Sequence, residues 1–180
     1  MKPMMTLFMA GLVGLATCAH GAGRPINPFD QIKTGDVGKV QILADTEVFS
    51  VHNADWRSKG VVITNKGTIA RMVTVLSGVV MTNRVVFPAI GVLGSQVFLG
   101  KTGEVLAVTT IINYRATVTI DRSLEEDSYA GGQSVEYCRI VYDIMKEVMP
   151  ARIRELDAMY RGTPGKSLEE LLFGTKKRNE

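Results

Sequence analysis

Apolar and polar positions divide the chain into an apolar leader, a central block and a helical remainder. Residues 60–121 are rich in Val, Ile and Thr and are broken by Gly, Pro and Asn, which is typical of strands and turns. From residue 134 onward, apolar residues recur at helical spacing. The pattern predicts an α+β fold: an antiparallel β-sheet of about four to six strands within residues 40–121, with the C-terminal helices packed on one face. A β-sandwich or barrel with a helical appendix is the alternative.

The first part of the predicted sheet consists of short segments. Residues 40–43 and 48–51 read as two strands joined by a four-residue turn, a plausible hairpin. Residues 61–82 carry apolar side chains on both faces, which predicts strands that are covered on two sides. Asn65-Lys66-Gly67 is the turn expected to break this segment.

The second part of the predicted sheet has longer segments. Residues 85–99 form one, in which Pro88 confines part of the segment to an edge or bulge, and Gly91 and Gly94 indicate bends or close packing. The loop Gly100–Gly103 joins it to residues 104–121, which read as one strand. At about 3.4 Å per residue, that strand extends roughly 60 Å, about three times the usual length. It must bend, span two sheets or project, and the hairpin Val85–Thr119 could then join strands of other copies.

The remainder of the chain is predicted to be helical. Residues 124–132 form an acidic loop that ends in a Gly pair, and residues 134–149 carry a wide apolar face suited to packing on a sheet. Pro150 either kinks this helix or begins the next one at its first turn.

A short helix near the C-terminus is predicted from its end signals. Ser167 and Glu170 have the spacing of a capping box, and Gly174 ends the helix. The expected organisation is a single α+β domain over residues 40–161, followed by this short helix and a basic tail in residues 162–180.

Residues 1–21 have the layout of a secretory signal peptide. The apolar run from residue 7 to 16 is too short for a permanent membrane span. Leu15-Ala16-Thr17-Cys18 resembles a bacterial lipobox, in which the cysteine becomes the lipidated first residue, although Thr17 stands where Gly, Ala or Ser is usual. Ordinary cleavage after Gly21 is the alternative, and no cleavage is a third.

Lipidation of Cys18 would make the chain a membrane-anchored protein, because several acyl chains together anchor stably. Residues 22–39 would then be the tether. Ala19, by resemblance to other bacterial lipoproteins, does not mark retention at the inner membrane. The predicted location is the periplasmic face of a bacterial outer membrane, or else the soluble periplasm or the medium. Cys138 would be the only thiol of the mature chain, and we expect it to be buried.

Length and charge limit the number of domains and the class of binding partner. The 180 residues suit one domain, and the net charge of +3 does not by itself indicate nucleic acid. Residues 59–122 hold seven basic and two acidic side chains. The chain from residue 123 onward holds nine basic and eleven acidic side chains. Either the two regions pair their charges internally, or the basic region is a face for anionic lipids, glycans or an acidic partner.

The candidate catalytic motifs are weak. Residues 94–102 resemble a phosphate-binding loop but have five residues between the two glycines instead of four, and no helix is predicted after the lysine. His52 is the only histidine beyond the leader, so a triad with Asp55 and Cys138 would depend on it, and a solvated loop histidine is the simpler interpretation. Zinc sites need more Cys and His than the chain offers. We predict no catalytic, cofactor or metal residue.

The sequence therefore favours a non-catalytic envelope lipoprotein, a structural subunit of a secretion, conjugation or motility complex that forms homo- or hetero-oligomers with other envelope proteins. The first alternative is a monomeric periplasmic module that binds a small apolar or anionic ligand between sheet and helix. A small secreted hydrolase that uses His52 is the second. Trp56 either contacts a partner or covers the edge of the core. The possible partner or membrane contacts are Trp56, Lys101, Lys176, Lys177 and Arg178.

Overall fold

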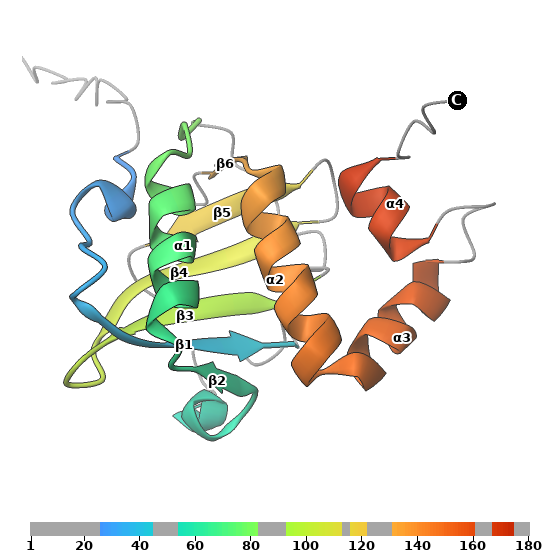
Figure 1. Cartoon of the computed structure of the whole chain (residues 1–180), viewed down its shortest axis with the longest axis horizontal. Coiled ribbons are helices and arrows are strands. Elements are labelled where there is room, and N and C mark those ends of the chain that lie inside the picture. The colour runs from blue at the N-terminus through green and yellow to red at the C-terminus, as the bar shows by residue number, and fades with distance from the viewer. Residues whose placement is uncertain are drawn as a thin grey trace, which may run out of the picture.

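One antiparallel sheet of six strands forms the centre of the protein (Figure 1). The computed structural model describes residues 26–44, 54–82, 93–112, 116–121, 131–160 and 167–174. The strand order is β2-β1-β3-β4-β5-β6. The strands are β1 (Val37–Leu43), β2 (Val61–Ile63), β3 (Ser95–Gly100), β4 (Val105–Ile112), β5 (Thr117–Asp121) and β6 (Gly131–Gln133). The predicted α+β fold is confirmed.

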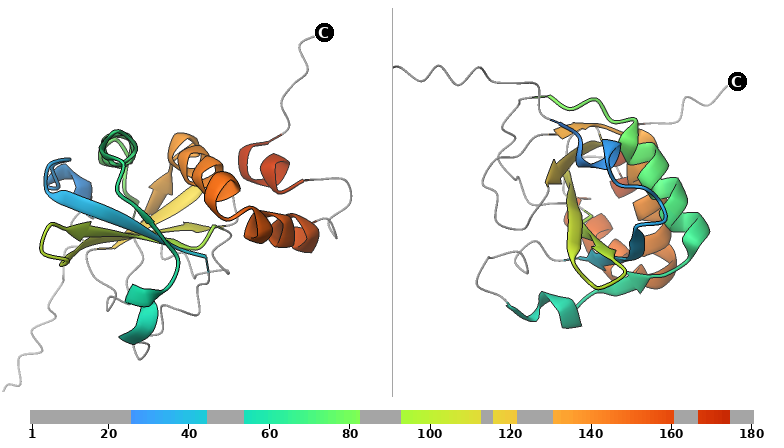
Figure 2. Two further views of the ribbon diagram at one scale, coloured as in Figure 1. Left: turned by 60° about the horizontal axis from the view of Figure 1, so that its bottom comes forward. Right: turned by 90° about the vertical axis from the view of Figure 1, so that its left-hand side faces the viewer.

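The helices cover one face of this sheet. Helices α1 (Lys66–Ser77) and α2 (Val135–Val148) lie side by side on it, and α3 (Pro150–Tyr160) and α4 (Leu168–Phe173) pack against α2 (Figures 1 and 2). Two short 3-10 helices, η1 (Pro28–Asp30) and η3 (Ala54–Ser58), complete the described elements. None of the helices in these ranges is both long and apolar enough to cross a membrane.

The strands predicted over residues 61–82 are wrong beyond Ile63, because this segment folds mainly into α1. Asn65, expected in a turn, caps the helix: its side-chain oxygen accepts a hydrogen bond from the Thr68 backbone N–H at 3.0 Å. The buried positions Ile69, Met72, Val73 and Leu76 follow the i, i+3, i+4, i+7 spacing of one helix face. The apolar positions that seemed to lie on both faces of a strand therefore lie on one side of a helix.

The single long strand predicted over residues 104–121 is also wrong. The segment forms the antiparallel pair β4 and β5, in register from Val108 opposite Asp121 to Ile112 opposite Thr117. Ala116, at the end of the connection, has φ +52°, in the left-handed region that few residues other than glycine adopt. Each strand has an ordinary length, so no surplus of strand extends beyond the domain.

This correction removes the structural basis for an intermolecular hairpin. Strand β3 pairs with β1 and β4, and β4 pairs with β3 and β5, all within the chain. Both edges of these strands are therefore occupied. Strand β1 pairs with β2 and β3, and the second strand of its predicted hairpin, residues 48–51, lies outside the described residues.

The C-terminal helices match the sequence prediction, whereas the start of the domain does not. Helices α2, α3 and α4 form as predicted, with Pro150 at the start of α3, a complete Ser167–Glu170 capping box and Gly174 after α4. The Gly pair expected in a loop instead forms β6, which pairs with β5. At the N-terminal end, Asn27 and Phe29 are already buried, so the packed body begins well before residue 40.

Two hydrophobic clusters fill the two faces of the sheet. The larger lies between the sheet and the helices and includes Phe98, Ile111, Met72 and Met145, all fully buried. The smaller lies on the opposite face and consists of Leu43, Trp56, Val97, Leu99 and Val108. The sheet is therefore covered with apolar side chains on both sides, which agrees with its high Val and Ile content.

Candidate functional site

The turn between β3 and β4 is a charged feature at one end of the sheet. The Gly100 N–H donates to the Glu104 carbonyl oxygen at 2.8 Å, and the Gly103 N–H donates to the Gly100 carbonyl at 3.1 Å. The Glu104 carboxylate folds back on the turn, where it accepts hydrogen bonds from the hydroxyl and the backbone N–H of Thr102. The hydroxyl bond above all lowers the pKa of Glu104. Lys101 is left exposed at the tip.

Lys101 and Glu104 line an open pocket of about 500 Å³, shared with the segment that follows η1. The apolar part of its lining comes from Pro28, Ile32 and Leu106. Its polar part comes from Gln31, Asp36, Lys101 and Glu104. Four of the seven lining residues are polar or charged, and the pocket is widely open to solvent. Small-molecule sites are typically enclosed and mostly apolar, so both features are less favourable for tight binding.

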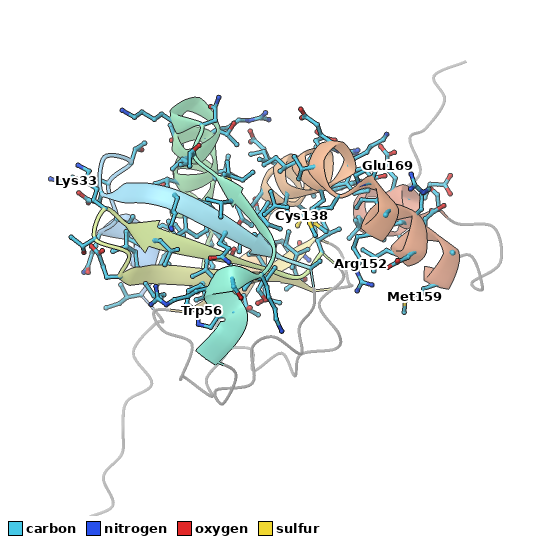
Figure 3. All side chains as sticks on the ribbon, turned by 90° about the horizontal axis from the view of Figure 1, so that it is seen from below. Lys33, Trp56, Cys138, Arg152, Met159 and Glu169 are labelled. Atoms are coloured by element: carbon cyan, nitrogen blue, oxygen red, sulfur yellow. The ribbon has the colours of Figure 1, made fainter. Side chains whose placement is uncertain are left out.

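Trp56 is buried, with 9% of its surface exposed, and packs on the sheet face opposite α2. Figure 3 shows it on the η3 side of the sheet and Cys138 on the helix side. The Gln41 side chain, 2% exposed, fixes η3 by donating to the carbonyl oxygens of Trp56 (2.9 Å), Arg57 and Lys59. Of the two interpretations of Trp56, its burial favours cover of the core edge over an exposed partner contact.

Arg57 connects η3 to the turn between β3 and β4. Its guanidinium lies 4.8 Å from the Trp56 ring centroid and donates to the Gly103 carbonyl oxygen at 3.1 Å. The structure thus brings Trp56 and Lys101, two predicted contact residues, to neighbouring elements, one buried and one exposed. The other four predicted residues, Cys18, Lys176, Lys177 and Arg178, lie outside the described residues, as does His52.

A buried polar cluster under α2 was not predicted. The Thr109 hydroxyl lies 2.6 Å from the Tyr137 hydroxyl and donates to the Gln96 side-chain oxygen at 2.9 Å. The Gln96 amide nitrogen donates to the carbonyls of Leu93 and Gly94. All three side chains are fully buried, and their hydrogen bonds are to one another or to nearby backbone. The cluster therefore ties α2 to β3 and β4, because each polar group finds its partner inside the core.

Cys138 is fully buried on α2, as expected. Burial raises the pKa of its thiol from its ordinary value to about 12, so the thiol is neutral at physiological pH. A neutral, enclosed thiol is a poor nucleophile and a poor metal ligand. Within the described residues, no three His, Cys, Asp or Glu side chains gather to hold a metal ion.

The raised pKa of the Cys138 thiol predicts loss of stability at alkaline pH. The unfolded chain releases this proton near pH 9 and the folded chain only near pH 12, so the stability is complete below pH 9 and falls above it. Between pH 8 and 10 this group should lower the free energy of unfolding by about 1.4 kcal/mol. Urea unfolding of the wild type and Cys138→Ala at both pH values measures it. An equal loss in the two proteins would contradict the assignment.

Comparison of the chain with protein families, with curated proteins and with solved structures gives no match. The function of the chain is therefore inferred from its own residues and their geometry.

Proposed function

We propose that this chain is a non-catalytic, lipid-anchored envelope protein that serves as a structural subunit of a larger assembly. The observation that carries the proposal is the short distance along the chain between the lipobox-like cysteine and the packed body. Eight residues separate Cys18 from Asn27, the first buried residue of the part of the chain that the structure describes. At about 3.3–3.6 Å per residue, that segment reaches about 30 Å at most. An anchored body would therefore stay close to the membrane surface.

Hydrogen bonds and ring packing fix the point where the tether meets the body. The Asn27 side-chain amide donates to the carbonyl oxygens of Leu76 (2.7 Å) and Val79 (3.1 Å), at the end of α1. Phe29 is 2% exposed, and its ring packs edge to face on the ring of Phe98, with 4.8 Å between the two ring centroids. In Figure 1, η1 and the β3–β4 turn with Lys101 lie at one end of the molecule, and α3 and α4 lie at the other. The Lys101 end would therefore be nearest the membrane.

Apolar side chains left on the surface support a role in assembly. Scattered exposed valines are ordinary on a monomer, but a subunit needs apolar surface that its partners cover. The most exposed large apolar residues of the described surface are Ile26, Val62, Val80, Val135, Val148 and Met159, each between 42% and 65% exposed. The buried polar groups described above, in contrast, are held in structural hydrogen bonds or shielded from solvent, which favours a non-catalytic role.

A second candidate, a monomeric periplasmic binding module, is favoured by the pocket beside Lys101. Its volume of about 500 Å³ is in the range of small-molecule sites. The space between sheet and helices, where such a ligand was expected, is filled by the larger hydrophobic cluster. A ligand of this kind would have to bind at the Lys101 pocket. Mass spectrometry of gently purified protein would reveal a bound small molecule if this candidate is right.

The state of Cys18 tests the anchoring part of the proposal. When the full chain is expressed with its own leader, we expect the mature protein to begin at an acylated Cys18 and to remain in the membrane fraction after a high-salt wash. Cys18→Ser should lose this association, because several buried acyl chains hold the protein in place. Cys138→Ala is the matched control and should stay in the membranes. An unmodified mature chain that begins at Ala22 would reject the lipoprotein assignment.

The assembly part is tested separately. Solubilisation of native membranes in mild detergent should give the protein in a complex, either with other envelope proteins or with further copies of itself. Isolation as a clean monomer would contradict this part of the proposal, whatever the state of Cys18.

A further inference from the structure

The pocket beside Lys101 combines one positive with two negative side chains. Lys101 supplies an ammonium group, and Asp36 and Glu104 supply carboxylates. All three residues are exposed, so a ligand at the surface can reach them. The lining therefore carries one more negative than positive charge. This balance repels a ligand that is only anionic, whereas a ligand with both an ammonium and an anionic group matches both signs.

Each of these charged groups keeps bonding capacity for a ligand. Asp36 Oδ2 accepts a hydrogen bond from the Lys33 backbone N–H at 3.0 Å. Glu104 Oε2 accepts hydrogen bonds from the backbone N–H, at 3.1 Å, and from the hydroxyl of Thr102. The second oxygen of each carboxylate has no hydrogen-bond partner among the described residues, and the Lys101 ammonium forms no ion pair with them. The pocket therefore offers two acceptors and one cation.

The pocket lies where the tether meets the packed body. Pro28, the first residue of η1, forms part of its apolar wall together with Ile32 and Leu106. Figure 3 shows Lys33, whose N–H binds Asp36, at the end of the molecule away from Met159. The short tether of an anchored chain would hold this end close to the lipid headgroups.

We propose that this pocket binds the headgroup of an aminophospholipid, a phosphoethanolamine group, in the membrane that carries the anchored chain. The lipid phosphate contacts the Lys101 ammonium, and the primary ammonium of the lipid donates to the second oxygens of Asp36 and Glu104. The glycerol and the first acyl carbons lie against the apolar wall. The site rests on the proposed anchoring and extends it, because its ligand is part of the membrane.

The chemistry of the pocket selects among lipid headgroups. A primary ammonium donates three hydrogen bonds, whereas the trimethylated ammonium of choline donates none and is held mainly by aromatic faces. None of the described residues that line the pocket is aromatic, so ethanolamine fits better than choline. A glycerol headgroup has no ammonium to place between the two carboxylates. An open pocket is sufficient for this ligand, because anchoring keeps it in a layer where headgroups are concentrated.

Native mass spectrometry tests the site on the full chain, expressed with its own leader and extracted in mild detergent. Lipids that have the same acyl chains but ethanolamine, choline or glycerol headgroups are added one at a time. The bound lipid is measured in the same spectrum that gives the mass of the protein and so shows whether Cys18 is acylated. The ethanolamine lipid should give about fivefold more adduct than either of the others.

Two conservative substitutions locate the binding. Lys101→Gln removes the charge that contacts the phosphate, and Asp36→Asn removes a carboxylate but keeps an oxygen that can accept from the Lys33 N–H. Each should lower the ethanolamine adduct about fivefold. Lys59→Gln and Asp143→Asn, at exposed residues outside the pocket, are the matched controls and should leave the adduct unchanged.

The outcomes separate this site from the anchoring. On an acylated chain, equal adducts of the ethanolamine and choline lipids, or adducts that neither pocket variant lowers, would overturn the site and leave the anchoring standing. Binding of free phosphoethanolamine without binding of the lipid would also overturn it, because the ligand would then be soluble. An unmodified mature chain in the same spectrum would reject the anchoring, and with it the membrane as the source of the ligand.

Discussion

Gly94→Ala is expected to destabilise the protein by on the order of 3 kcal/mol or more, or to prevent folding altogether. Gly94 has φ +66°, a conformation that costs other residues about 1–2 kcal/mol. A methyl group there would also lie 1.9 Å from the Leu43 carbonyl oxygen and 2.8 Å from its carbonyl carbon. These are backbone atoms of β1, so they cannot move aside without breaking the pairing of Leu43 with Ser95. Urea unfolding, followed by the fluorescence of Trp56, measures the loss.

Gly103→Ala is the matched control for this effect. Gly103 also has a positive φ, +91°, but nothing lies within 4 Å of an added methyl group. It should therefore show only the conformational cost, on the order of 1 kcal/mol. If the two variants were equally stable, the close contact between Gly94 and β1 would not be present in the folded protein. Trp56 is a suitable probe because it is the single tryptophan and packs in the same cluster as Leu43.

Gly94 also illustrates what the sequence can and cannot predict. A glycine inside an apolar segment indicates a bend or a close approach, and here it marks both the left-handed backbone and the contact with β1. The neighbour that approaches was not predictable, because Leu43 is distant along the chain. The buried cluster of Gln96, Thr109 and Tyr137 was missed for the same reason.

The secondary-structure predictions were correct where a short sequence signal decides the structure, and wrong where contacts distant along the chain decide it. The capping box at Ser167 and the proline at the start of α3 were predicted correctly because each signal and its effect lie within one helical turn. The turn before β5 was missed because it contains neither Gly nor Pro, and Ala116 takes the left-handed conformation instead. In α1, β-branched residues favoured strand, whereas burial of one helix face decided the outcome.

Phe29→Ala is the second substitution with a large expected effect, a loss of about 3–5 kcal/mol in the free energy of unfolding. Phe29 is among the largest fully buried side chains, and its ring packs on Phe98 at the centre of β3. Removal of the ring would leave a cavity between η1 and the sheet. The hydrogen bonds from Asn27 to the end of α1 would remain, together with the packing of Pro28 and Ile32. Ile26→Ala, at a side chain 64% exposed, is the control and should change stability by less than about 0.5 kcal/mol.

The same substitution links the fold to the proposed anchoring. If η1 detaches, the first fixed point of the body moves from Asn27 to the start of β1 at Val37. The segment after Cys18 would then reach about 60 Å instead of about 30 Å. In membranes, Phe29→Ala should therefore make the bond after Lys33 more accessible to trypsin, even under conditions in which the domain remains folded. Unchanged cleavage together with a small loss of stability would show that Phe29 does not hold the tether to the sheet.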